Sequence, residues 1–160
     1  MPIGLIATFI AVFFIGAAAV GSQLRNLIPG EGPASRMDNL ALVTAQQAEL
    51  LGSACINHAL ASPGVVGTNI ATPLPPGVVT QQLKWACEVD AAPGGGRNIY
   101  AWLATSPGAA GYVMNDTDFS AVWHIVRSTG QAQNLVTRDI VSVPAAIPVG
   151  ALVDIVYTST

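Results

Sequence analysis

Basic residues are scarce in this sequence of 160 residues, and lysine is almost absent. The chain has six Lys and Arg residues against nine Asp and Glu residues, a formal net charge of −3, and a single lysine, Lys84. A nucleic-acid-binding domain needs Lys and Arg clustered on one face to contact phosphate groups. The sequence holds no such cluster, so its composition argues against nucleic acid as a partner.

The residue patterns of enzyme and metal sites are missing as well. The two histidines, His58 and His124, do not stand in a zinc-binding spacing such as H-E-x-x-H. The glycine run at 94–96 is followed by Arg97, where a phosphate-binding loop would have a lysine and the start of a helix. We interpret this run as the flexible tip of a hairpin. We therefore expect a protein that is not an enzyme and has no catalytic residues, metal or cofactor.

What the sequence does contain is one long apolar run at its beginning. Residues 1–23 include no charged side chain, and about 20 apolar helical residues cross the roughly 30 Å hydrocarbon core of a bilayer. The basic segment that opens a secretory signal peptide is absent. We predict a transmembrane helix or fibre-core helix over residues 1–28, with a cleaved signal and a buried core helix as alternatives. Gly4, Gly16 and Gly21 would permit close helix packing in either setting.

A break in the helical pattern follows at residues 29–33. Pro29 and Pro33 lack amide donors, and Gly30 and Gly32 loosen the backbone. These residues predict a hinge between the apolar run and the rest of the chain.

Residues 34–160 are expected to form an α+β globular domain. Apolar residues spaced by three and four from Met37 to Cys55 predict an amphipathic helix over residues 34–60. Alternating apolar and polar residues over 81–105, interrupted by a Pro/Gly turn, predict an antiparallel hairpin.

The second half of this domain is expected to hold a short helix and further strands. Thr117 as N-cap and Gly130 as C-terminal stop bracket an apolar stripe and predict a helix over 117–130. Strand-like runs lie around 135–143 and 151–158. The order predicts an antiparallel sheet packed on a helix. The stripe consists of Phe119, Val122, Trp123 and Val126.

Cys55 and Cys87 are candidates for a disulfide. Both fall on faces that we expect to be buried, one on the long helix and one on the first strand of the hairpin. A bond between them would close a loop of about 31 residues and stabilise the fold by roughly 3 to 4 kcal/mol. Two buried thiols in a reducing compartment are the alternative.

The charges near the apolar run and the cysteines point to different compartments. Arg25 and Arg36 follow the run, and the positive-inside rule would keep the body in the cytoplasm. The two cysteines and the scarcity of lysine favour a body outside the cytoplasm. We predict a bacterial inner-membrane protein with a periplasmic domain.

Three motifs give the sequence a family resemblance. They are LPP at 74–76, YAW at 100–102 and VPAAIPVGALVDIV at 143–156. Together with the apolar run, their order resembles the small PilM-type membrane proteins of plasmid-encoded type IVb (thin) pilus systems. The resemblance implies an inner-membrane protein with a periplasmic domain that is needed for pilus assembly, has other pilus-system proteins as partners and has no enzymatic activity.

More broadly, the sequence is similar to type IV pilins and minor pilins. These subunits have an apolar N-terminal helix followed by an α+β head with one disulfide, and they usually carry glutamate at the fifth mature position, where this chain has Leu5. This similarity implies the alternative function: a structural subunit of an extracellular filament, with the N-terminal helix in the fibre core and copies of the chain as partners.

Overall fold

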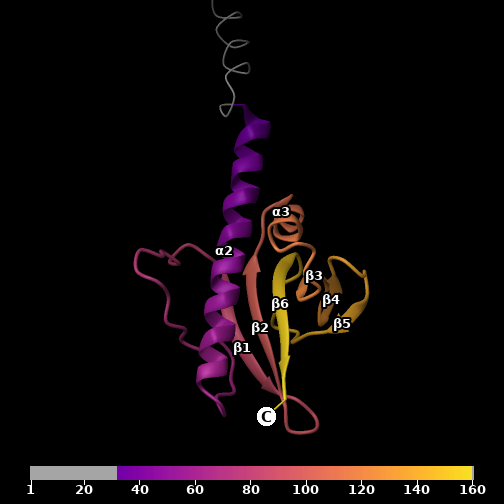
Figure 1. Ribbon diagram of the computed structural model, residues 1–160. Coiled ribbons are helices and arrows are strands. Elements are labelled where there is room, and N and C mark those ends of the chain that lie inside the picture. Colours follow the sequence, from indigo (N-terminus) through magenta and orange to yellow (C-terminus); the bar gives the residue numbers. More distant parts are fainter. Residues whose placement is uncertain (1–31, 160) are drawn as a thin grey trace, which may run out of the picture. The chain divides into compact units, whose positions relative to one another are not determined.

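A computed structural model describes residues 32–159 of the chain (Figure 1). The chain divides into two units, residues 1–39 and 40–160. The described part of the first unit is the beginning of helix α2. With the labels of Figure 1, the elements are α2 (Pro33–Ala61), β1 (Trp85–Ala91), β2 (Arg97–Ala104), α3 (Ala109–Asp116), β3 (Trp123–Ser128), β4 (Gln131–Asn134), β5 (Ile140–Ser142) and β6 (Ala151–Thr158).

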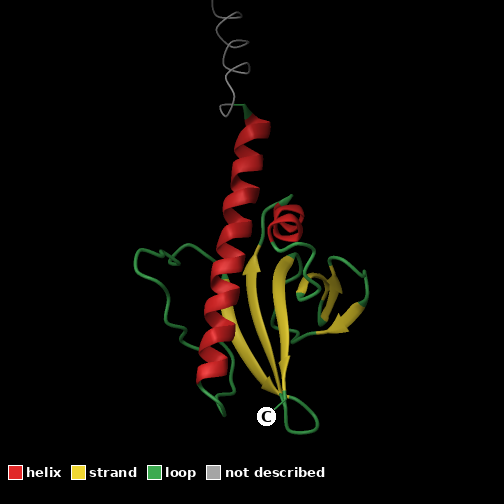
Figure 2. Ribbon diagram, in the orientation of Figure 1, coloured by secondary structure: helices red, strands yellow, loops and turns green. Residues whose placement is uncertain are grey.

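The strands form one six-stranded antiparallel sheet in the order β1-β2-β6-β3-β4-β5. The C-terminal strand β6 lies between β2 and β3 (Figure 2). It pairs with β2 along its whole length, from Ala151 opposite Ala104 to Thr158 opposite Arg97. The last strand of the sequence therefore joins the early hairpin to the later strands, and the sheet is complete only when residues 151–158 are in place.

Helix α2 buries a stripe of mostly small side chains. Alanine has the highest helix propensity, and small side chains let a helix approach a sheet closely. Met37 and Leu40, which were expected on the buried stripe, are exposed, because the residues that turn inward are Ala41 and Ala45 instead. The buried residues of α2 are Ala41, Thr44, Ala45, Ala48, Leu51, Gly52, Cys55 and Ala59.

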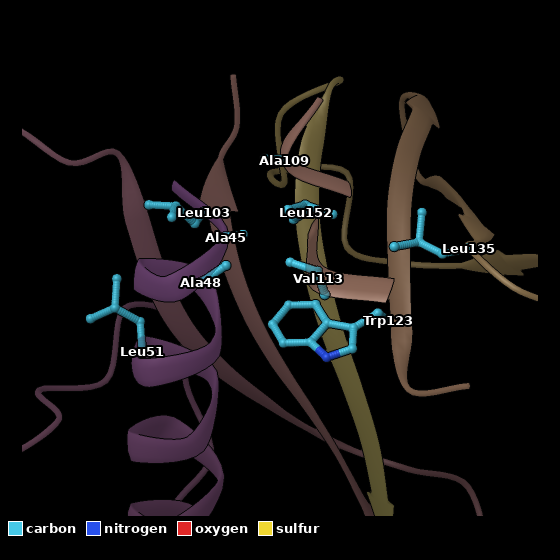
Figure 3. Packing of buried hydrophobic residues seen from close by; sticks show 9 residues of the cluster. All are labelled: Ala45, Ala48, Leu51, Leu103, Ala109, Val113, Trp123, Leu135 and Leu152. Carbon is cyan, nitrogen blue, oxygen red and sulfur yellow. The ribbon is translucent and has the colours of Figure 1, made fainter. Parts of the chain in front are cut away.

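The sheet has a hydrophobic core on each face, because neighbouring residues of β6 point to opposite sides. Leu152 belongs to the core between the sheet, α2 and α3, and Val153 belongs to the core on the other face. Figure 3 shows the first core, which consists of Ala45, Ala48, Leu51, Leu103, Ala109, Val113, Trp123, Leu135 and Leu152. The second consists of Tyr100, Val126, Ala132, Val143, Ile147, Ala151 and Val153.

A disulfide joins Cys55 of α2 to Cys87 of β1, with the two Cα atoms 5.5 Å apart. Both cysteines are fully buried, in a third cluster with Val89 and Ile99. The helix crosses the first strand of the hairpin at this point. The bond therefore ties α2 covalently to the sheet.

Arg97, the first residue of β2, caps the C-terminal end of α2. Its guanidinium donates hydrogen bonds to the carbonyl oxygens of Ala59, Ser62 and Val65, at 3.1, 3.2 and 3.3 Å. The last carbonyls of a helix have no donor within the helix, and a positive charge there is favoured by the helix dipole. Arg97 is buried, and its Nε atom has no hydrogen-bond partner among the described residues.

The turn between β1 and β2 needs its glycines for two different reasons. Gly94 and Gly95 have φ values of 100° and 96°, in the left-handed region that glycine adopts freely. Gly96 needs space instead: a Cβ atom there would lie 2.5 Å from the Tyr157 hydroxyl and 2.6 Å from the carbonyl oxygen of Thr158. At Gly96 the run predicted as a flexible tip is closely packed against β6.

The helix predicted over 117–130 is wrong. Residues Trp123–Ser128 form β3, and the short helix is α3, one segment earlier. Thr117 lies at the C-terminal end of α3, where its hydroxyl donates to the Val113 carbonyl oxygen at 2.6 Å. Asp118 and Phe119 then have positive φ values of 49° and 58°. A right-handed helix cannot continue through such residues, so no helix runs from 117 to 130. The strand-like run around 135–143 is also placed differently, because residues 135–139 form the turn between β4 and β5.

The predicted membrane anchor also requires a correction. Among residues 32–159, no helix combines the length and the apolar character needed to cross a bilayer. The fold class with a transmembrane helix and the inner-membrane localisation are therefore contradicted in the described part of the chain. The interval 1–28, on which the prediction was made, lies outside the described residues. The α+β class, the long helix 34–60 and the hairpin within 81–105 agree with the structure.

Candidate functional site

A groove runs between α2 and the connection from α2 to β1. It has two parts with volumes of about 930 and 350 Å³, and Gln46 and Leu50 of α2 line both of them. We call this surface the α2 groove. The wall opposite α2 is formed by residues 73–75 in the larger part and by residues 77–79 and Leu83 in the smaller part.

The α2 groove exposes large apolar side chains. Val43 is 47% exposed, Leu50 is 36% exposed, and Val79 is 69% exposed. The outer wall is attached to the edge of the sheet, because the Gly67 and Ile70 amides donate to carbonyl oxygens of β1. A contiguous apolar surface on an anchored wall is typical of a protein contact site.

A smaller acidic pocket of about 370 Å³ adjoins the α2 groove and shares Glu49 with it. Glu49 comes from α2 and Asp154 comes from β6, and the lining contains no Lys, Arg or His. The remaining lining residues are Ser53, Ile56, Asn57, Thr117, Ser120, Val122 and Trp123. Hydroxyl and amide groups therefore surround two carboxyl groups that have no basic residue beside them in the pocket.

Asp154 is the most perturbed group of this pocket. It is 5% exposed, and its Oδ1 atom is buried without a hydrogen-bond partner. Burial raises its pKa from the ordinary value of 3.8 to about 7, because an apolar environment disfavours the charged form. Its carboxyl group lies beside Gly52 of α2, where a Cβ atom would come within 3.1 Å of Oδ2 and 3.3 Å of the Trp123 ring.

The pKa of Glu49 is raised like that of Asp154, although the Glu49 side chain is only half-buried. Its Oε1 atom is buried and has no hydrogen-bond partner. Burial, followed by the negative charge of Asp116, raises the pKa of Glu49. The pocket therefore holds two carboxyl groups whose ionisation is disfavoured and which no basic residue of the lining offsets.

The two histidines have different surroundings. His58 lines the larger part of the α2 groove. His124 is buried on β3, where Nδ1–H donates to the Val122 carbonyl oxygen at 2.8 Å and Nε2 accepts from the Asn134 amide at 3.2 Å. Burial lowers the pKa of His124, so this neutral side chain serves the packing of β3 against β4.

Some of the remaining sequence-predicted residues lie in the described part of the chain, and the others lie outside it. Cys55 and Cys87 meet in the disulfide. Of the hinge residues, Gly32 precedes α2 and Pro33 is its first residue. Outside the described residues lie Pro29 and Gly30 of the hinge and the glycines Gly4, Gly16 and Gly21 of the helix-packing face.

The acidic pocket was missed by sequence reasoning. The signal was present in β6, where Asp154 shares a face with Leu152 and Val156 in an otherwise apolar segment. A charged residue on a core-facing position indicates either a partner or a function. Nothing in the sequence indicated that Glu49 would line the same pocket.

Comparisons with known proteins give little further information. No protein-family model matches the chain, and no curated protein matches it. Among solved structures, the chain is similar to protein PilM from Escherichia coli B7A, with 16% sequence identity and a TM-score of 0.41. The match covers 77% of this chain and 93% of that one. This likeness is weak.

Proposed function

We propose that this chain is a non-enzymatic component of a bacterial type IVb pilus system and that its domain makes protein–protein contacts during pilus assembly. The observation that carries the contact function is the α2 groove, where Val43, Leu50 and Val79 expose apolar surface to solvent. Burying such surface against a partner is favourable by about 25 cal/mol per Å².

The assignment to a pilus system rests on the sequence resemblance, and the positions of its motifs support a contact role. Leu74 of the LPP motif lines the groove between two prolines and packs against the first core. The YAW motif lies within β2, and the 143–156 motif supplies β6 and part of the second core. The motifs thus build the sheet and the wall of the groove.

A filament subunit is the second candidate. It is favoured by the packing of one long helix on an antiparallel sheet with a single disulfide, which is the head architecture that the similarity to pilins implies. In this alternative the α2 groove would be covered by a neighbouring copy in the fibre.

The test is to delete the gene in its own bacterium and count pili by electron microscopy. We expect the deletion strain to lose pili, the wild-type gene to restore them, and Leu50→Glu to restore few. Ile140→Glu, at an apolar residue on β5 that is 66% exposed and thus more exposed than Leu50, is the control and should restore pili fully. Normal piliation of the deletion strain would overturn the proposal. Shearing the cells separates the two candidates: recovery of the chain in released fibres identifies a filament subunit, and its absence from them identifies an assembly component.

A further inference from the structure

The acidic pocket holds buried carboxyl oxygens that lack any partner within the described domain. The side chain of Asp154 is only 5% exposed. Its Oδ1 atom has no hydrogen-bond partner, and the same is true of the Oε1 atom of Glu49. Buried polar atoms are nearly always satisfied. Two such atoms from different elements around one pocket show that no residue of the described range 32–159 satisfies these carboxyl oxygens.

The lining of this pocket favours a positively charged hydrogen-bond donor. The titratable lining residues are Glu49 and Asp154, and Asp116 lies close enough to Glu49 to influence its charge. No lysine, arginine or histidine lines the pocket. A cation is favoured electrostatically beside these carboxylates, and several N–H donors would satisfy the free oxygens.

A metal ion fits this pocket poorly. Within residues 32–159, no group of three His, Cys, Asp or Glu side chains is placed to hold a metal ion. An alkylammonium group needs no such ligand set, because its three N–H bonds can be shared among carboxylate and hydroxyl oxygens. Ile56 and Val122 offer apolar contacts to an alkyl stem, and Trp123 offers an aromatic ring to the charge.

We propose that the acidic pocket binds the primary ammonium group of a lysine side chain presented by a partner protein, with Asp154 and Glu49 as the carboxylate acceptors. The identity of the partner as a pilus protein rests on the proposed function, but the recognition of the ammonium group does not. Since Glu49 also lines the α2 groove, a partner seated in the groove could insert a lysine into the pocket.

The test uses Nα-acetyl-lysine N′-methylamide as the probe and the full chain, observed by NMR through the indole N–H signal of Trp123. The isosteric norleucine derivative, which lacks the charge, is the matched control ligand. We expect the lysine probe to shift the Trp123 signal saturably and the norleucine probe to leave it unchanged. Asp154→Asn should weaken the affinity at least about tenfold, and Glu49→Gln about two- to fivefold. Asp139→Asn, the same change at an exposed site, should not alter it.

The outcomes separate cleanly. Equal binding of the two probes, or unchanged affinity in both pocket variants, would overturn the proposal. Binding of calcium chloride at the same site in preference to the lysine probe would also overturn it, because it would identify a metal site. Loss of binding in Glu49→Gln supports the proposal even if Asp154→Asn fails to fold. Pilus counts in the deletion strain are measured separately, so that failure of the lysine pocket and failure of the pilus function are distinguishable.

Discussion

The buried carboxyl group of Asp154 makes a quantitative prediction about stability. Its pKa in the folded state is about 7, compared with an ordinary value of 3.8. Because the folded-state pKa is raised, the folded protein binds this proton more tightly than the unfolded chain. Stability is therefore lost as the pH rises from about 4 to about 7, where the folded carboxyl is forced to ionise in an apolar site.

The size of the loss follows from the two pKa values. Between pH 5 and pH 8, proton linkage at Asp154 lowers the free energy of unfolding by about 2.6 kcal/mol. Asp154→Asn replaces the carboxyl by a neutral amide of the same shape, which does not titrate. The difference in stability between the variant and the wild type should consequently shift by about 2.6 kcal/mol in favour of the variant over this interval.

Urea denaturation of both proteins at pH 5 and pH 8, followed by tryptophan fluorescence, measures this difference. Other titrating groups, including His124, are present in both proteins and cancel in the comparison. Asp139→Asn, which changes an exposed carboxyl, is the control and should follow the wild type. A difference between Asp154→Asn and the wild type that stays constant within 0.5 kcal/mol, a tolerance of roughly the size expected for non-additivity, would refute the assigned environment of Asp154.

Three further predictions concern the disulfide, the contacts of Arg97 with the end of α2, and the packing of the β1–β2 turn. Replacing both Cys55 and Cys87 by alanine opens a loop with a sequence separation of 32 and should lower the free energy of unfolding by about 3.7 kcal/mol; equal stability in urea titrations of the oxidised wild type and the variant would contradict this. Arg97→Met keeps the aliphatic stem but removes the donors at the end of α2 and should cost about 2 to 4 kcal/mol, whereas a change below 0.5 kcal/mol, which is typical of surface substitutions, would show that the cap is dispensable. Gly96→Ala should lower the thermal midpoint, since its Cβ atom would overlap β6 at a cost of about 1 to 3 kcal/mol. Gly111→Ala, where a Cβ atom on α3 meets nothing within 4 Å, should raise the midpoint through helix propensity, so a fall in both variants would contradict the distinction.

The elements with a long and uniform residue pattern could be predicted from the sequence. Helix α2 repeats apolar residues by three and four over 29 residues, and no proline interrupts it after Pro33. Strand β6 is a mostly apolar run of eight residues, several of them β-branched, and its neighbours Leu152 and Val153 lie on opposite faces of the sheet. Long patterns of this kind leave little room for another interpretation.

The segment around Trp123 was misread because it satisfies two periods. Val122 and Val126 lie four residues apart, as on a helix, but Trp123 and Ile125 lie two residues apart and face one core, as on a strand, while Val126 faces the other. Beta-branched residues fit a pleated sheet, and the neighbouring strand β6 decides between the two patterns, since Ile125 pairs opposite Leu152. That partner is remote in sequence, so local reasoning could not include it.

The acidic pocket depends on tertiary structure in the same way. Glu49 and Asp154 lie far apart in the chain and meet only because β6 is inserted into the sheet beside β2 and under α2. The composition could reveal that basic residues are few. It could not reveal that two carboxyl groups would line one pocket that contains no basic residue.

The most direct test of the contact function is photo-crosslinking in the living bacterium. A benzophenone amino acid is placed at Leu50 in the α2 groove or, as control, at Ile140 on β5, and the crosslinked products are identified by mass spectrometry. We predict that Leu50 crosslinks to proteins of the pilus system and that Ile140 does not. Identical products from the two positions, or no pilus protein among those from Leu50, would contradict the assignment of the α2 groove as the surface through which this domain acts.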